Sequence, residues 1–332
     1  MGIRGYIVVL LIVMMSSLGF AQESTNEMTS DVDDKFFSYK MKRPNKKRGS
    51  IFGFPLLSFA VPGIGQFLNG QYGPGFVYSG TAFAGAATAV SGVIELSNRN
   101  DNDADNDDDL YVEGFEDKDP AVRRILVGTS LYTLAGSLSL YHSFQTVVDF
   151  RKQQGDFSFL PDERETTDEL MLAPFEFGFL GRWTTWVPLV SLLGLVFVDG
   201  ANDDYNTRDS LNAGDYALAG TLSYGAGVGE EAMFRGWLYP AFINSYGEDN
   251  EFWANATQAA IFGALHYSRD NRFPLFQALG GFYWGWLTRK NNWSLKESIF
   301  IHTWWDVIAF TAIFAQGDKK ASIYIPLYQS QF

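Results

Sequence analysis

The chain has no cysteine, which excludes disulfide bonds and thiolate metal sites and leaves histidines and carboxylates as the candidate transition-metal ligands. Histidine is also scarce, with 3 residues in a chain of 332. Basic residues are in the minority, because 25 Lys and Arg against 38 Asp and Glu give a formal net charge of -13. Surfaces that bind nucleic acid need clustered Lys and Arg, so this balance argues against nucleic acid as a partner.

Apolar and small residues are abundant instead. Hydrophobic residues make up 46% of the chain, which also has 33 glycines and 29 phenylalanines. The mean hydropathy of -0.07 is low for a membrane protein, because acidic loops rich in Asn and Asp dilute the apolar runs. We therefore expect an all-α fold, a polytopic membrane helix bundle in contact with lipid.

The N-terminus has the pattern of a secretory signal peptide over residues 1–21, with a basic start, an apolar run and small residues before Gln22. An uncleaved anchor is the alternative. The bacterial style of this signal predicts a multi-pass protein of the bacterial inner membrane. Residues 22–50 are polar and charged, and we expect a mobile segment there.

Residues 51–150 are expected to form an N-terminal transmembrane hairpin and helix region. The apolar run 51–68 is interrupted by Pro62-Gly63-Ile64-Gly65-Gln66, which resembles the turn of small two-helix membrane modules. Further apolar runs at 76–94 and 125–148 predict helices. We expect a helical hairpin in or on the membrane, where irregular backbone must be covered by protein or line water.

An acidic loop is expected at residues 98–119. The alternating oxygens of residues 101–109 resemble the first half of a calcium loop, but Asn106 and Val112 stand where such loops need glycine and a bidentate carboxylate. The sequence therefore favours a solvated acidic loop over a calcium site.

A polar linker is predicted at residues 151–171, before a core at 172–316 and a C-terminal tail at 317–332. Several apolar runs of the core are shorter than the roughly 20 residues needed to cross a bilayer, as helices that flank a buried polar site can be. These runs cover residues 183–198, 216–242, 252–266, 274–287 and 295–314.

Ionisable residues interrupt the apolar core at three places. Glu230 and Glu231 are followed at helical spacing by Arg235, and the two later segments each contain a histidine, His266 and His302. Charged side chains in such segments are costly, so they face a polar interior and mark function. The third histidine, at position 142, has no acidic partner at helical spacing and is expected to be structural.

The spacing suggests hydrolytic chemistry. Glu231 and Arg235 share a helical face and can form an ion pair, while Glu230 points about a quarter-turn away. That leaves Glu230 available as a general base near an imidazole. His302 and Asp306 also share a face, and donors there can stabilise the oxyanion formed when water attacks an amide carbonyl.

These segments resemble the CPBP family of membrane endopeptidases, which includes the type II CAAX prenyl endopeptidases and bacteriocin-processing proteins. The resemblance rests on Glu-Glu-x-x-x-Arg at 230–235, Phe-x-x-x-His at 262–266 and His-x-x-x-Asn/Asp at 302–306, and it covers about residues 175–315. It implies an endopeptidase, a protease-type hydrolase, that acts on a membrane protein or peptide. The implied roles are water activation by Glu230 and His266, an oxyanion site at His302 and Asp306, and a brace formed by Glu231 with Arg235.

Asp306 differs from most members that resemble the prenyl endopeptidases, which have asparagine at this position. An ionised aspartate cannot donate to an oxyanion, so Asp306 either carries a proton or orients His302. The prenyl-cysteine substrate is not carried over, and the substrate stays open.

The same residues are compatible with several other functions. Glu230, His266 and His302 match the ligand types of a zinc site with an open position for water, which would make the same protease zinc-dependent. A catalytically silent scaffold or immunity-type protein that binds a peptide, and a metal-binding or ion-conducting bundle, are the other candidates. The ion pair and histidines can also be purely structural.

Two further features favour packing over ligand binding. The glycine-rich run 225–229 lacks the third glycine and the βαβ context of a nucleotide-binding loop, so it favours close helix packing. Trp284 and the other tryptophans of the core are interpreted as packing or membrane-interface residues.

Overall fold

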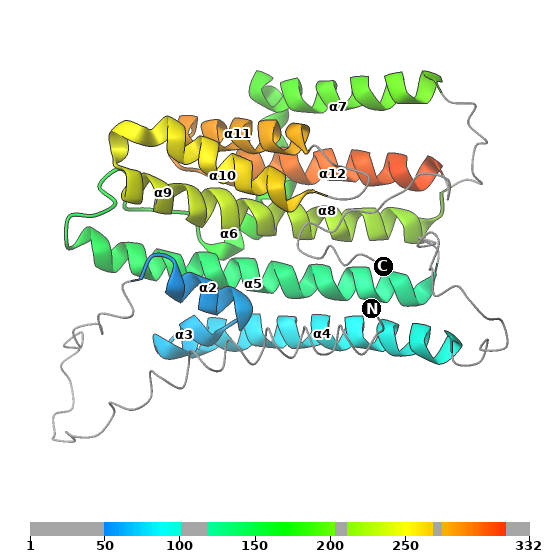
Figure 1. Cartoon of the computed structure of the whole chain (residues 1–332), viewed down its shortest axis with the longest axis horizontal. Coiled ribbons are helices and arrows are strands. Elements are labelled where there is room, and N and C mark those ends of the chain that lie inside the picture. The colour runs from blue at the N-terminus through cyan, green and yellow to red at the C-terminus, as the bar shows by residue number, and fades with distance from the viewer. Residues whose placement is uncertain (1–49, 101–118, 203–210, 268–273, 317–332) are drawn as a thin grey trace.

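The computed structural model describes residues 50–100, 119–202, 211–267 and 274–316. The predicted signal peptide, all but the last residue of the polar segment 22–50, the calcium-loop-like part of the acidic loop and the C-terminal tail lie outside these residues. Every regular element in the described part is helical, which confirms the predicted all-α class. Figure 1 shows the long helices running along the long axis of an elongated bundle.

The N-terminal region is helical, and its residues 51–100 are called the N-terminal hairpin below. Two short helices, α2 (Gly53–Ala60) and α3 (Ile64–Leu68), precede the long helices α4 (Tyr72–Asn100) and α5 (Pro120–Lys152). Gly63 lies between α2 and α3 with a φ of 94°, a left-handed conformation that favours glycine. Gly63 of the Pro-Gly-x-Gly-Gln turn therefore allows the chain to change direction between α2 and α3.

A buried polar network joins this hairpin to α5. The side chain of Gln66 donates from Nε2 to the carbonyl of Ser139 at 3.0 Å and to Ser143 Oγ at 3.1 Å, and it accepts from Ser139 Oγ at 2.8 Å. A Cβ at Gly65 would lie 2.1 Å from Ser58 Oγ. The network thus requires glycine at position 65 and glutamine at position 66.

The remaining helices form the second part of the bundle, in which α8 runs on through the π-helix η4 into α9 without a loop. The helices are α6 (Thr167–Leu172), α7 (Trp183–Asn202), α8 (Ala213–Met233), η4 (Phe234–Leu238), α9 (Tyr239–Tyr246), α10 (Glu251–Leu265), α11 (Leu275–Lys290) and α12 (Lys296–Gln316), with short 3₁₀ turns η2 (Ala173–Phe175), η3 (Phe177–Gly181) and η5 (Glu248–Asn250).

Helix α8 is central, since it packs against α5 on one side and α12 on the other (Figure 1). Its glycines allow this close approach: a Cβ at Gly225 would lie 2.1 Å from Ser130 Oγ on α5, and one at Gly227 would lie 2.2 Å from Thr303 Oγ1 on α12. The interpretation of the glycine-rich run as a helix-packing surface is confirmed.

Helix α7 lies at the edge of the bundle and packs against α12. The buried carboxylate of Glu297, in the first turn of α12, accepts hydrogen bonds from Thr184 and Thr185 at the start of α7 and from Arg182 just before it. A carboxylate buried at this depth needs such partners. Glu297 therefore fixes the start of α7 to α12.

One hydrophobic cluster contains buried residues from both sides of the predicted linker. Leu140 and Phe144 of α5 belong to the same cluster as Met233 and Trp237 near the end of α8. Between them, residues 153–166 form turns and irregular structure before α6. The N-terminal helices thus support the elements that hold the ionisable residues.

Two of the described helical spans, Tyr72–Asn98 and Lys296–Ala315, are long and apolar enough to cross a membrane. Large apolar side chains are also exposed on the outer helices, including Phe76 and Phe83 of α4 and Trp183 of α7. Apolar surface of this extent marks a contact with lipid or protein. A membrane location is supported at this coarse level.

Candidate active site

The adjacent glutamates lie in the last turns of α8. Glu230 is 5% exposed and Glu231 is fully buried. Arg235 follows in the π-helix η4 and is also fully buried. π-Helical turns inside longer helices occur frequently at functional sites. The predicted ion pair is present, with 2.8 Å between Arg235 Nη1 and Glu231 Oε1.

Glu231 also binds His302 of α12. The same oxygen, Oε1, lies 2.8 Å from Nδ1 of His302. An ionised carboxylate only accepts hydrogen bonds, so Nδ1 is the donor. This bond fixes the orientation of the imidazole and leaves its Nε2 directed toward Glu230, at 3.7 Å from Oε2.

His266 also lies near Glu230. It follows the last residue of α10 and its Nδ1 lies 2.7 Å from the carbonyl oxygen of Phe262, which can only accept. Its Nε2 lies 3.9 Å from Glu230 Oε2. That carboxylate oxygen is buried and makes no hydrogen bond to protein. The Nε2 atoms of His266 and His302 therefore both lie near one carboxylate oxygen of Glu230.

Asp306 lies one helical turn after His302. Its Oδ2 is 3.6 Å from His302 Nε2, beyond direct hydrogen-bonding distance, and its side chain is 19% exposed. Of the predicted site residues, Asp306 is the most accessible and His266 is next, with 12% of its side chain exposed. The structure thus brings all six predicted residues together.

Aromatic rings enclose the charged groups. The guanidinium carbon of Arg235 lies 4.5 Å from the ring centroid of Phe262 and 5.2 Å from that of Trp284. Since Nε and Nη2 of Arg235 make no hydrogen bonds, these π faces partly replace them. Trp284 also stacks on His302, with 4.3 Å between centroids and 14° between planes. The sequence interpretation of Trp284 as a packing residue missed this contact with the site.

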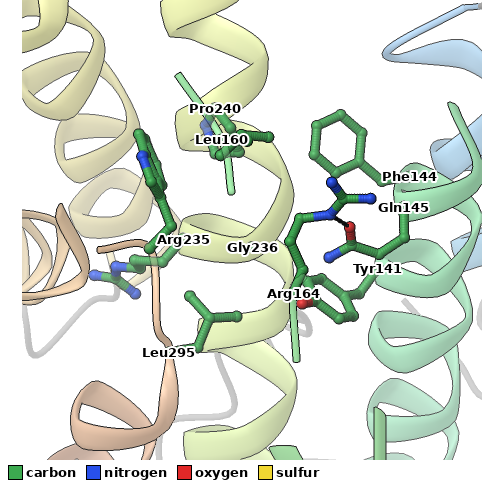
Figure 2. A pocket seen from close by; sticks show the side chains of 10 residues that line it. Tyr141, Phe144, Gln145, Leu160, Arg164, Arg235, Gly236, Pro240 and Leu295 are labelled. Atoms are coloured by element: carbon green, nitrogen blue, oxygen red, sulfur yellow. Dashed lines mark hydrogen bonds between the residues drawn. The ribbon is translucent and has the colours of Figure 1, made fainter. Parts of the chain in front are cut away.

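A small pocket lies beside η4 and is lined in part by Arg235 and Gly236. It has a volume of about 20 Å³, enough for about one water molecule. Figure 2 shows Arg164 hydrogen-bonded to Gln145 in this pocket and the Arg235 side chain directed away from both. The pocket is lined by Tyr141, Phe144, Gln145, Leu160, Arg164, Arg235, Gly236, Pro240, Trp293 and Leu295. Glu230 and the two site histidines are not among its lining residues.

Within the described residues, no group of three or more His, Cys, Asp or Glu side chains is placed to hold a metal ion. The alternative zinc set of Glu230, His266 and His302 lies within these residues and does not form such a group.

The arrangement defines a class of protein, a helical bundle with a buried site of glutamate and histidine side chains. Residues 213–308 match the family model described as Rce1-like, type II CAAX prenyl endopeptidase Rce1-like. The resemblance to CPBP proteases is thereby confirmed for this region, which contains all six site residues. The matched family consists of membrane-embedded endopeptidases, which are hydrolases of peptide bonds.

The match begins at the first residue of α8, so α7 and the N-terminal helices lie outside it. No match was found among curated proteins or among solved structures.

Proposed function

We propose that this protein is an intramembrane endopeptidase that hydrolyses a peptide bond of a membrane-associated protein or peptide, with water activated by Glu230 and His266. One observation carries the proposal. The buried Oε2 of Glu230 has no hydrogen-bond partner, yet it lies 3.9 Å from His266 Nε2 and 3.7 Å from His302 Nε2.

The separation between Glu230 and His266 suits one shared water. Two acceptor or donor atoms 3.9 Å apart can both bond to a water at ordinary hydrogen-bond lengths, with an angle at the water of about 90°. In the neutral ring, Nδ1 of His266 donates to Phe262, so Nε2 can accept from that water. Both groups would then orient the water oxygen for attack.

In the proposed reaction, Glu230 takes a proton from the water as its oxygen bonds to the scissile carbonyl carbon. The proton then passes to the amide nitrogen as the carbon–nitrogen bond breaks. The products are a new carboxyl end and a new amino end. No covalent enzyme intermediate is required, and the carboxylate of Glu230 is restored.

The oxyanion of the tetrahedral intermediate needs donors. His302 can supply one from Nε2 while Nδ1 donates to Glu231, provided that the ring carries both protons. Asp306 lies 3.6 Å from the same nitrogen, where it either orients the imidazole or, when protonated, donates to the oxyanion itself. Glu231 and Arg235 act as the brace, because together they fix His302.

A multi-pass location in a bacterial inner membrane belongs to the same proposal, with lipid as a second partner. It is supported by the two candidate spans, since α12 provides both one of these spans and the His302–Asp306 pair. The substrate would then meet the site within or beside the bilayer.

The test is cleavage of a quenched membrane-peptide library by purified protein in detergent. Wild type is compared with Glu230→Gln, and with Glu251→Gln as a matched control on α10 that pairs with Arg289. Cleavage that is lost in Glu230→Gln and survives a chelator supports the metal-free mechanism. Cleavage lost in both conditions favours the zinc-dependent form.

A well-folded wild type that cleaves no member of the library would favour the scaffold or immunity-type alternative. In that case Glu230→Gln should still bind the partner peptide, because binding does not require a general base. The two functions are therefore separable with the same three proteins.

A further inference from the structure

Trp284 of α11 is buried to 6% exposure and lies against the proposed catalytic histidine. We propose that Trp284 is a positioning residue, whose indole face holds the His302 imidazole so that Nδ1 stays on Glu231 and Nε2 faces Glu230. The proposal rests on the function proposed above and adds a residue that the three motifs do not include.

The His302 ring is restrained on three sides. Trp284 covers one face at 4.3 Å and 14°. Phe262 meets the ring nearly at right angles, with 6.0 Å between centroids and 78° between planes. Glu231 holds Nδ1 at 2.8 Å. A flip of the imidazole would break this bond and has to pass through the stacked indole, so Glu231 selects the orientation and the stacking hinders its loss.

The position of Trp284 is set by hydrogen bonds between α10 and α11. Asn255 Nδ2 donates to the carbonyl of Phe282 at 3.0 Å, and Gln258 Nε2 donates to the carbonyl of Gly281 at 3.0 Å. These backbone acceptors precede Trp284 on the same helix. The two amides therefore fix the rotation of α11 about its axis, which directs Trp284 toward His302.

Glycines on α11 make this approach possible. A Cβ at Gly285 would lie 1.9 Å from Asn255 Oδ1, and one at Gly281 would lie 3.0 Å from Arg235 Nη2. Trp284 thus stands on a helix that is held closely against both α10 and the Arg235 guanidinium. For the same reason the indole also lies near a cation, with its centroid 5.2 Å from the guanidinium carbon of Arg235.

A π face beside His302 matters most when the ring carries both protons, the state that donation from both nitrogens requires. The face of an indole attracts a cation, and the attraction grows when the pair is desolvated. Trp284 would accordingly favour the donor form of His302 in the transition state as well as its orientation.

The test uses two readouts. The first is cleavage kinetics of Trp284→Leu and Trp284→Phe. We expect kcat to fall about tenfold in Trp284→Leu with little change in KM, as expected for loss of a desolvated stacking and cation–π contact, and to recover partly in Trp284→Phe. Trp286→Leu is the matched control, because Trp286 is on the same helix but 39% exposed.

The second readout is independent of activity. The chain has 3 histidines, so the imidazole resonances of labelled protein can be assigned by single substitutions. We expect the ring current of Trp284 to shift the His302 ring protons upfield in wild type, and this shift to disappear in Trp284→Leu. The resonances of His142, on α5, should stay unchanged and report that the variant is folded.

Unchanged His302 resonances in Trp284→Leu, or a kcat within about twofold of wild type, would overturn the proposal. If Trp284→Leu does not fold, Trp284→Phe gives the same comparison, because its smaller ring produces a weaker shift. If the wild type cleaves nothing, the proposed function fails, while the resonances still decide whether Trp284 stacks on His302.

Discussion

At the scale of single residues, Glu230 and Glu231 are neighbours with opposite bonding. Glu231 binds Arg235 and His302 through Oε1, and its Oε2 has no hydrogen-bond partner. The Oε2 of Glu230 also has none, but it lies 3.9 Å from His266 Nε2 and 3.7 Å from His302 Nε2. The difference separates a residue that holds the site together from one that is available for chemistry. Glu231→Gln should therefore lose stability, whereas Glu230→Gln should lose activity.

We predict that Glu231→Gln lowers stability far more than Glu230→Gln. Removing the Glu231 charge leaves the fully buried Arg235 without its counter-ion, a loss that typically costs about 3–5 kcal/mol. Glu230→Gln breaks no ion pair of this kind. Thermal unfolding of both variants in the same detergent measures the difference, and equal melting temperatures would contradict the assigned brace.

The ion pair could be predicted from the sequence, because its two residues are four apart on one helix. The contact between Glu231 and His302 could not, since it depends on how closely α8 and α12 pack where Gly227 meets Thr303. Trp284 is a buried packing residue, as the sequence indicated, but its contact with His302 could not be predicted for a similar reason. Its stacking on His302 depends on the rotation of α11, which amides of α10 determine.

At the scale of elements, the N-terminal hairpin is tied to the site through α5 and η4. Trp237 of η4 donates from its indole to the carbonyl of Ile51 at 2.7 Å, and α5 packs along α8. The hairpin thus contacts the π-helix that carries Arg235. This gives the segment outside the family match a role in supporting the matched region.

We predict that Gln66→Leu destabilises the protein by about 1–3 kcal/mol, because Ser139 and Ser143 lose their buried amide partner. Gln154→Leu, at an exposed position after α5, is the control and should have little effect. Unfolding in increasing denaturing detergent compares the two. If both variants unfold like wild type, the network does not hold the hairpin on α5.

Most helices could be predicted from the apolar runs, and the break between α2 and α3 from the Pro-Gly-x-Gly-Gln turn. The π-helix η4 could not be predicted. The apolar run 216–242 has no proline before Pro240, which already lies in α9, so nothing marks the change between α8 and α9. The register of η4 is determined by tertiary packing, for example by Tyr141, which fills the space beside Gly236.

At the scale of the whole molecule, the chain has no native cysteine, which makes its membrane arrangement directly measurable. The starts of α5 and α8 lie together, joined by the Arg123–Asp215 ion pair, and both helices run the same way along the bundle (Figure 1). A bilayer across the bundle would therefore place Ala213, the first residue of α8, and Gln154, after the end of α5, on opposite sides.

We predict that Ala213→Cys and Gln154→Cys react with a membrane-impermeant maleimide from opposite sides of sealed vesicles. The absence of other thiols means that labelling of wild type gives the background. Labelling of both positions from the same side would contradict a bundle whose α8 crosses the membrane, and with it an intramembrane site.

The most direct test of the role of Glu230 is the initial cleavage rate of one susceptible peptide by wild type, Glu230→Gln and Glu251→Gln in the same detergent. A general base typically contributes about 10²–10⁴-fold to the rate, so Glu230→Gln should be slower by this factor and fully folded. Glu251→Gln should cleave like wild type. A Glu230→Gln protein that cleaves at the wild-type rate would contradict water activation by Glu230.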